Sequence, residues 1–217
     1  MNTLDIQARL MALGFDPGPI DGVMGVRTRR AMQMFKRRKG HAIEDDIHPS
    51  GLHRVVLHWT AGAAGLIDLE REHYHLIIGQ DARPYMGKHR PEANGVIRAA
   101  YAAHTRGLNT GSIGVALDAM ADATERPWWR GSNPITRPML DTLAREVADL
   151  CLTYRIPVSR WTVLSHAEVQ PTLGVWQRNK WDIAWIPEMD GPGDPVVVGD
   201  ELRQMIRAQL PRSVAAA

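Results

Sequence analysis

The stretch "HRVVLHWTAGAAG", residues 53–65, places a histidine close to the end of an apolar segment. Its first eight residues predict a β-strand, in which Val56, His58 and Thr60 share one face because side chains alternate along a strand. The small residues that follow predict a flexible loop able to approach a substrate. A histidine in this position suits a structural role as well as metal binding, so the rest of the chain must decide.

Further strands and helices are predicted on the C-terminal side of this stretch. Strands are expected at residues 75–79, 112–118 and 160–166, and helices at residues 67–73, 136–156 and 200–210. The helix at 136–156 is the clearest, because Thr136 can cap it, Pro138 suits its first turn, and one apolar face recurs at helical spacing: Met139, Leu143, Val147, Leu150, Cys151 and Tyr154. Strands interleaved with helices predict an α/β fold with a mixed central β-sheet flanked by helices.

The first forty residues predict a small, separate all-α module. One helix can be capped by Thr3 and ends at Gly14, with apolar positions at Leu4, Ile6, Leu10 and Leu13. The turn "DPGPIDGVMG" follows at residues 16–25. A second helix over residues 27–38 is expected to bury Ala31, Met34 and Phe35.

The predicted domain boundaries follow from these segments. Residues 1–40 form the module, residues 41–52 a polar linker, and residues 53–217 the larger domain. A chain of about forty residues is near the lower limit for an independent core. We therefore expect the module to lean on its neighbour.

Composition narrows the chemistry. The apolar content of 44% supports a real core, but no run reaches the roughly 18 apolar residues of a membrane span, so we expect no membrane insertion. A single cysteine, Cys151, excludes an internal disulfide and a cysteine-rich zinc site. Nine histidines leave ligation by imidazole and carboxylate as the plausible metal chemistry.

The segment "RTRRAMQMFKRRK", residues 27–39, holds seven basic residues and no acid. Such a cluster is compatible with a solvated helix face. It is equally compatible with attraction to a polyanion, either an anionic cell envelope or a nucleic acid.

The segment "LSHAEVQPTLGVWQRNKWDIAW", residues 164–185, contains a histidine, a lysine and an aspartate. His166 and Asp182 could ligate one metal while Lys180 points at what the metal activates. The same residues could also belong to an ordinary packed segment, because a metal site needs a third ligand.

The module resembles the peptidoglycan-binding modules found at the ends of cell-wall hydrolases. The resemblance rests on a pattern of apolar and turn residues around Asp21, Gly22 and Gly25, and includes Leu10, Leu13, Gly14, Phe15, Pro17, Gly18, Ile20, Thr28, Ala31 and Phe35. Most of these residues are expected to build the turn. Binding would use the groove that they create.

Residues 53–187 resemble the zinc-dependent N-acetylmuramoyl-L-alanine amidases, whose fold is shared with peptidoglycan recognition proteins. The shared motifs are a strand ending in histidine, a Tyr-His strand start at residues 74–75, "HTRGLNTGSIG" at 104–114, and "SHAEVQP" leading to "KWD". The resemblance implies that His58, His166 and Asp182 bind Zn²⁺. It further implies that Tyr74 and Lys180 act in catalysis.

The same resemblance implies that His104 lines the cleft. We expect His104, Asn109 and Trp176 to contact the substrate, with Trp176 in a loop that could also only pack. Two features depart from the common pattern. Lys180 follows His166 by fourteen positions, which leaves a longer loop than usual, and Ala116 stands where many members carry a glutamate that acts as general base. The adjacent Trp128 and Trp129 could stack on sugar rings or only anchor their loop.

Both resemblances together predict a modular endolysin that uses a zinc-bound hydroxide to cut the amide bond between N-acetylmuramic acid and L-alanine. The start "MNTLDIQARLMALGF" is polar and periodic, unlike a secretory signal. We therefore expect the protein in the host cytoplasm until a separate membrane pore releases it to the wall. Peptidoglycan is the expected partner, nucleic acid is not, and we expect a monomer.

Three alternatives remain, one of them an enzyme and two from other classes of protein. A cytoplasmic amidase that recycles soluble muropeptides would not need the wall-binding module. A non-catalytic peptidoglycan receptor would not need to keep the complete ligand set of His58, His166 and Asp182. A nucleic-acid binder built on residues 27–39 is a third alternative.

Overall fold

The computed structural model describes residues 1–211, so residues 212–217 of the predicted 53–217 domain lie outside the described residues. Its centre is one five-stranded sheet with the order β3-β2-β4-β1-β5. All neighbouring pairs are parallel except the antiparallel edge pair of β2 and β3. The strands are β1 (Arg54–Trp59), β2 (Leu76–Ile78), β3 (Pro84–Met86), β4 (Ser112–Leu117) and β5 (Val163–Ser165). The predicted mixed sheet is confirmed, with β3 as an addition.

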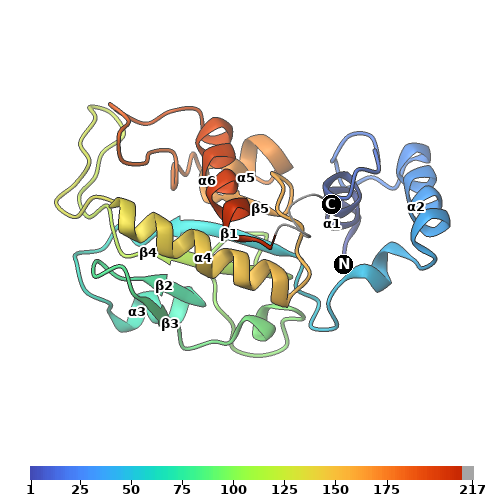
Figure 1. The fold of residues 1–217 in the computed structure, drawn as a ribbon, viewed down its shortest axis with the longest axis horizontal. Helices are drawn as coiled ribbons and strands as arrows, with labels where there is room; N and C mark the ends of the chain where they lie inside the picture. Colours follow the sequence, from blue (N-terminus) through green and yellow to red (C-terminus); the bar gives the residue numbers. More distant parts are fainter. Residues whose placement is uncertain (212–217) are drawn as a thin grey trace.

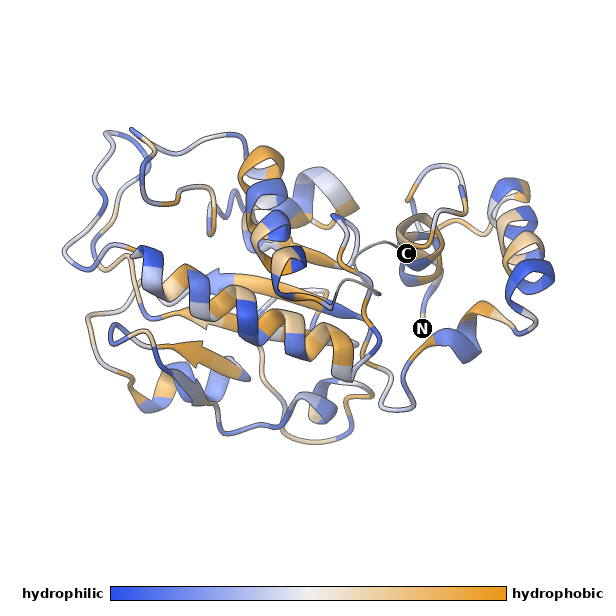
Figure 2. Ribbon diagram, in the orientation of Figure 1, coloured by the Kyte–Doolittle hydropathy of each residue, from blue (hydrophilic) through white to orange (hydrophobic). Residues whose placement is uncertain are grey.

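Two long helices, α4 (Arg137–Thr153) and α6 (Pro195–Gln209), cover one face of the sheet (Figure 1). Apolar and polar residues are interleaved along both, as expected for helices with one buried side (Figure 2). Thr136 occupies the predicted N-cap of α4, although its side chain forms no capping hydrogen bond. Helix α6 begins five residues before the predicted start, because the Asp194 carboxylate accepts hydrogen bonds from the backbone of Val196 and Val197.

The opposite face of the sheet is covered by α5 (His166–Leu173) and the loop around Leu108. The sequence prediction missed α5 and ran the preceding strand on to His166. The helix begins there with Ser165 as its N-cap, and the Glu168 carboxylate accepts a hydrogen bond from the backbone N–H of Ser165 at 2.8 Å. His166 is therefore the first residue of α5, directly after the end of β5.

The N-terminal module consists of α1 (Thr3–Ala12), α2 (Val26–Lys39) and the short 3₁₀ turn η1 (Ile43–Asp46). Asn2, and not Thr3 as predicted, caps α1. Met34 was predicted to be buried but is 51% exposed, while Thr28 takes a buried position on α2. The core of the module is formed by Ile6, Leu10, Phe15, Ala31, Phe35 and Ile43.

The module packs directly on the larger domain through α1. Ala8 joins a buried cluster with Val56 of β1, and Asp5 forms a buried ion pair with Arg54, the first residue of β1. The Asp5 carboxylate also lies 3.3 Å from Nε2 of His53. Burial by itself raises the pKa of Asp5, but the hydrogen bond from His53 and the charge of Arg54 outweigh it and lower that pKa.

Two shorter elements complete the described chain, the helix α3 (Asp68–His73) and the 3₁₀ turn η2 (Pro91–Asn94). Cys151 lies on the buried side of α4, where burial raises the pKa of its thiol to about 12. No helix within residues 1–211 combines the length and apolarity that a membrane crossing requires.

Candidate functional site

The parallel pairing of β1 with β4 and β5 positions the first candidate ligand. His58 lies on the sheet face opposite α4 and α6, beside Ala116 of β4, and is 1% exposed. Gly114, two residues before Ala116, leaves room for the ring of His104, with which a Cβ at that position would collide. Gly114, the glycine of the "SIG" motif, thus lets His104 approach β4, the strand that pairs with β1 next to His58.

His58, His166 and Asp182 converge at one point. Nδ1 of His58 and Nδ1 of His166 each lie 3.1 Å from Oδ2 of Asp182. One potential ligand atom from each residue lies within 4.8 Å of the others, and all three residues are buried. The three residues predicted as metal ligands, which are far apart in sequence, therefore meet in the fold.

Gln177 determines which nitrogen of His166 carries a proton. Its Nε2 donates to the carbonyl of Arg106 at 2.8 Å, so its Oε1 must be the atom that faces Nε2 of His166 at 2.9 Å. An amide oxygen only accepts, and Nε2 of His166 must therefore be the donor. In the neutral imidazole, Nδ1 then keeps its lone pair, which points at Asp182. Burial lowers the pKa of His166, but the contact with Asp182 outweighs burial and raises that pKa, so a cation bound here would compete with a proton on Nδ1.

A chain of hydrogen bonds through His104, here called the His104 relay, determines which nitrogen of His58 carries a proton. Nε2 of His104 lies 3.3 Å from the carbonyl of Ser112 and must donate to it. Burial lowers the pKa of His104 well below its usual value, so the ring is neutral and its Nδ1 accepts. Nε2 of His58, which is 3.2 Å from that Nδ1 and 3.3 Å from Oγ1 of Thr105, is left as a donor.

With both Nε2 atoms protonated, two imidazole lone pairs and a carboxylate oxygen face one another. Burial, opposed only in part by Asp182, lowers the pKa of His58 to about 4, which keeps it neutral near pH 7. Burial raises the pKa of Asp182, but its close contacts with His166 and His58 outweigh burial and lower that pKa to about 2, so the carboxylate is ionised. Facing acceptors repel unless a cation lies between them, and two imidazoles with one carboxylate suit Zn²⁺ with an open fourth position.

A cavity of about 390 Å³ opens above this point. His166 and Asp182 reach its wall, so that a metal held there would be accessible from the cavity. The wall also carries four of the predicted residues together with two arginines that were not predicted: Tyr74, His104, Trp176, Lys180, Arg106 and Arg178. Within residues 1–211, Asp182 is the only carboxylate in the cavity wall.

Tyr74 and Lys180 flank the cluster. The ring of Tyr74 lies 5.2 Å from that of His58, and burial raises the pKa of its phenol, which therefore stays protonated and can donate a hydrogen bond. Lys180 is exposed at the cavity, and its positive charge opposes protonation of both His58 and His166. The positive charge of its ammonium group thus reaches the point where His58, His166 and Asp182 converge.

The remaining predicted contacts separate into two groups. Trp176 is 59% exposed in the cavity wall, and the guanidinium of Arg178 lies over its ring at 5.6 Å. Asn109 lies outside the cavity wall, and its Oδ1 accepts from the backbone of Thr105 at 2.8 Å. Its contact with substrate stays a prediction, while the structure gives it a part in holding the loop that carries His104.

The two adjacent tryptophans lie outside the cavity wall. Trp128 packs on Trp181 and Trp185, with ring centroids 6.4 and 5.2 Å apart, and so anchors its loop. Trp129 is 51% exposed. Stacking on sugar rings would fall to Trp129 alone.

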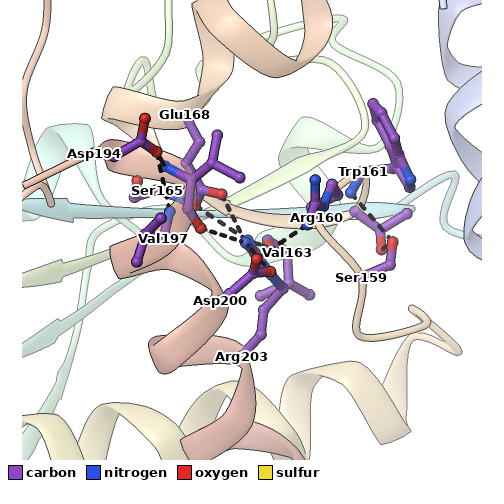
Figure 3. Close-up of polar contacts among 12 residues, drawn as sticks. Ser159, Arg160, Trp161, Val163, Ser165, Glu168, Asp194, Val197, Asp200 and Arg203 are labelled. Carbon is purple, nitrogen blue, oxygen red and sulfur yellow. Dashed lines mark hydrogen bonds and ion pairs between the residues drawn. The ribbon is translucent and has the colours of Figure 1, made fainter.

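Glu168 lies on the far side of α5 from the cavity. Its carboxylate meets the guanidinium of Arg203 from α6 at 2.8 Å and also caps the backbone of Ser165 (Figure 3). Both charged side chains are at most 1% exposed. This closed ion pair leaves Glu168 no access to a substrate, so it holds α5 against α6.

In the module, the predicted residues form a turn around a buried glutamine. Gln7 accepts from the backbone of Asp21 and Gly22 and donates to the Asp21 carboxylate. Gly22 has a φ of +76°, a conformation that glycine adopts without strain. Asp21 and Gly25 line a hollow of about 220 Å³, while Gly22 serves the turn beneath it.

Sequence reasoning missed three side chains that support the site: Thr105, Arg106 and Gln177. Their contacts depend on two loops, 104–108 and 174–180, that meet only in the folded chain. The unusual length of the loop before Lys180 was the one available signal that something extra is built there.

Residues 49–189 match the family model described as N-acetylmuramoyl-L-alanine amidase, which covers more than half of the chain. The chain belongs to this family. Residues 2–43 of the amidase match a second model, described as a putative peptidoglycan binding domain. The amidase thus joins a catalytic domain and a peptidoglycan-binding domain, as the motifs predicted.

Solved structures similar to the amidase have low sequence identity to it. N-acetylmuramoyl-L-alanine amidase LysC from Clostridium intestinale is 14% identical, with a TM-score of 0.42 over 76% of this chain and 91% of that one. Peptidoglycan recognition protein SD from Drosophila is 18% identical, with a TM-score of 0.40 over 68% of this chain and 85% of that one. No curated protein matches the amidase.

Proposed function

We propose that this amidase is a zinc-dependent phage endolysin that hydrolyses the bond between N-acetylmuramic acid and L-alanine. The observation that carries the proposal is the convergence of His58, His166 and Asp182 under an open cavity. The tautomers imposed by Gln177 and by the His104 relay leave a lone pair on each Nδ1. Bound there, zinc would activate a water molecule for attack on the amide carbonyl.

Lys180 and Tyr74 supply the remaining polar groups of the reaction. Attack on the carbonyl carbon places negative charge on the carbonyl oxygen, and donors around that oxygen lower the barrier. The Lys180 ammonium group and the Tyr74 phenol are the donors that flank the metal-ligating cluster. The C–N bond then breaks, and the leaving nitrogen of L-alanine takes up a proton.

The candidates for general base are reduced by the surrounding contacts. Position 116 is an alanine beside His58, and Glu168 is closed off in its ion pair with Arg203. Both ring nitrogens of His104 are engaged in hydrogen bonds. We therefore propose that no separate general base is used. The proton passes from the activated water to the leaving nitrogen with the participation of Tyr74.

Product analysis tests the reaction. Full-length protein incubated with purified peptidoglycan should release stem peptides with a free L-alanine amino terminus and leave the sugar chains intact. Chelation should abolish release, and added zinc should restore it. New reducing sugar ends without new amino termini would overturn the amidase assignment, and full activity after exhaustive chelation would overturn the zinc assignment.

The endolysin assignment extends to location. We propose that the protein accumulates in the cytoplasm of the host and reaches the wall through a separate membrane pore. The combination of wall-binding and wall-cutting domains in one chain supports this proposal. Expression with a phage pore protein should lyse cells rapidly, and expression without it should not. Equal lysis in both cultures would contradict the dependence on a pore.

A further inference from the structure

Among residues 1–211, no helix or strand packs against the outer side of α2. Thr28, Ala31 and Phe35 face the module core, whereas Val26 and Met34 are 79% and 51% exposed. Helical spacing places Val26 about half a turn from the core positions and Met34 about a quarter turn from their centre, so both lie outside the buried side of α2. An exposed apolar pair on an otherwise strongly basic helix calls for a partner that accepts both kinds of group.

Three arginines share this outer side. A surface hollow of about 660 Å³ is lined by Val26, Arg29, Arg30, Gln33, Met34 and Arg37. The other five residues are three, four, seven, eight and eleven positions from Val26, which places them on one stripe of the helix. We name this set the α2 face.

The charge of the α2 face is not neutralised by the protein. Arg27, at its edge, is paired with Asp16 at 2.5 Å, and Arg38 lies over the ring of Phe15. Arg29, Arg30 and Arg37 form no ion pair with any of residues 1–211. Helix α2 itself contains no acidic residue.

We propose that the α2 face binds the surface of an anionic phospholipid bilayer. Arginine guanidinium groups match phosphate in charge and in hydrogen-bond geometry. Val26 and Met34 would enter the boundary between head groups and acyl chains, as the apolar residues of an interfacial helix do. A soluble polyanion would use the arginines but has no need of the two exposed apolar side chains, and this favours the bilayer.

The position of α2 fits such a contact. It lies at the outer end of the molecule, with α1 between it and the catalytic domain (Figure 1). Hydrophilic residues predominate along the ribbon of α2, interrupted by hydrophobic ones (Figure 2). The α2 face can therefore rest on a membrane while the cavity of the catalytic domain remains open to peptidoglycan.

Vesicle sedimentation with the full-length protein tests the electrostatic part. Binding to vesicles of phosphatidylglycerol and phosphatidylcholine should exceed binding to phosphatidylcholine alone, and salt should weaken it. Replacing Arg29, Arg30 and Arg37 by Gln should weaken binding at least about tenfold, since each basic residue near such a surface contributes roughly 1 kcal/mol. The matched control replaces the exposed Arg98, Arg126 and Arg130 by Gln, has the same net charge, and should bind nearly as well as the unaltered protein.

A second pair of variants tests the apolar part. Val26→Gln with Met34→Gln should weaken vesicle binding severalfold, whereas Val197→Gln, at an exposed valine of α6, should not. Glutamine is a good helix former, so these exposed substitutions preserve α2. Equal binding to neutral vesicles would overturn the proposal. So would binding to polyphosphate or DNA that matches vesicle binding and ignores the Val26 and Met34 changes.

Discussion

Helix α5 begins with two buried polar residues that belong to opposite kinds of cluster. Glu168 points to α6, where Arg203 supplies the matching charge and the pair is sealed from solvent (Figure 3). His166 points to the other side, where it meets His58 and Asp182 at the wall of a cavity. The first cluster contains its own cation, whereas the second gathers three acceptors around a point.

This difference separates a structural cluster from a reactive one. Buried polar groups in native proteins normally find partners of complementary charge, as Glu168 does. Three acceptors held together by outside contacts have no such balance, and a bound cation or a proton on His166 would supply it. Burial and sequence spacing alone would not have distinguished His166 from Glu168, which are two positions apart.

The largest effect is expected from His166→Ala. The variant should lose detectable amide cleavage and bind much less zinc than the roughly one ion per chain expected for a single site. Elemental analysis of purified protein, with product release from peptidoglycan, measures both. Equal zinc in the variant and the unaltered protein would remove His166 from the site.

Arg203→Met should have the opposite signature. Removing one partner of a buried ion pair leaves an uncompensated charge, here Glu168, and should lower the free energy of unfolding by about 3–5 kcal/mol. Zinc content and cleavage per folded molecule should be retained. Urea unfolding measures the change, and Arg207→Met is the control, because Arg207 is exposed and should cost no more than about 0.5 kcal/mol. A loss of zinc in Arg203→Met would contradict the separation of the clusters.

Lys180→Ala should preserve both zinc and stability while slowing the chemistry. Loss of a donor to the developing oxyanion typically lowers turnover on the order of a hundredfold or more. Tyr74→Phe should show a smaller loss, because its ring still packs beside His58. Turnover with saturating peptidoglycan fragments gives the result, with Lys88→Ala, at a surface ion pair with Glu72, as control. Near-normal turnover in a double variant of Lys180 and Tyr74 would refute these roles.

The smallest effect concerns Gln177. Gln177→Met removes the acceptor from Nε2 of His166 at nearly constant volume and should weaken zinc binding about 10- to 100-fold. Gln170→Met is the matched control, because Gln170 holds the same loop through the backbone of Gln177 without touching His166. Competition with a chromophoric chelator measures both affinities. Equal losses in the two variants would show that only loop order matters.

The grouping of His58, His166 and Asp182 was predictable from sequence, because these residues lie in the motifs that resemble the amidase family. His58 ends a strand, and His166 and Asp182 frame one segment. The helix after His166 was also accessible, since Ser165 and Glu168 have the spacing of a capping box. The strands β1, β2, β4 and β5 and the helix α4 follow similarly local signals.

Other features depend on contacts that no local pattern contains. Gln177 acts through a loop whose path is set by Gln170 and Arg106 in the folded chain. Met34 was wrongly predicted to be buried, because helical spacing places it beside Ala31 and Phe35. A module with so few apolar residues covers only a narrow side of α2, and Met34 falls outside it.

The buried contact of Asp5 with Arg54 and His53 bears on how such proteins can be recombined. Arg54 is 1% exposed and belongs to β1, an inner strand of the catalytic domain, yet its countercharge comes from the first helix of the module. Exchanging the module for one from another protein would leave a guanidinium sealed in the protein interior without its carboxylate. A functional chimera must therefore either bring an acid to the position of Asp5 or replace Arg54 by an apolar residue at the same time. The unit that can be exchanged therefore includes the start of β1. Its boundary does not coincide with the segment that connects the two domains in the chain.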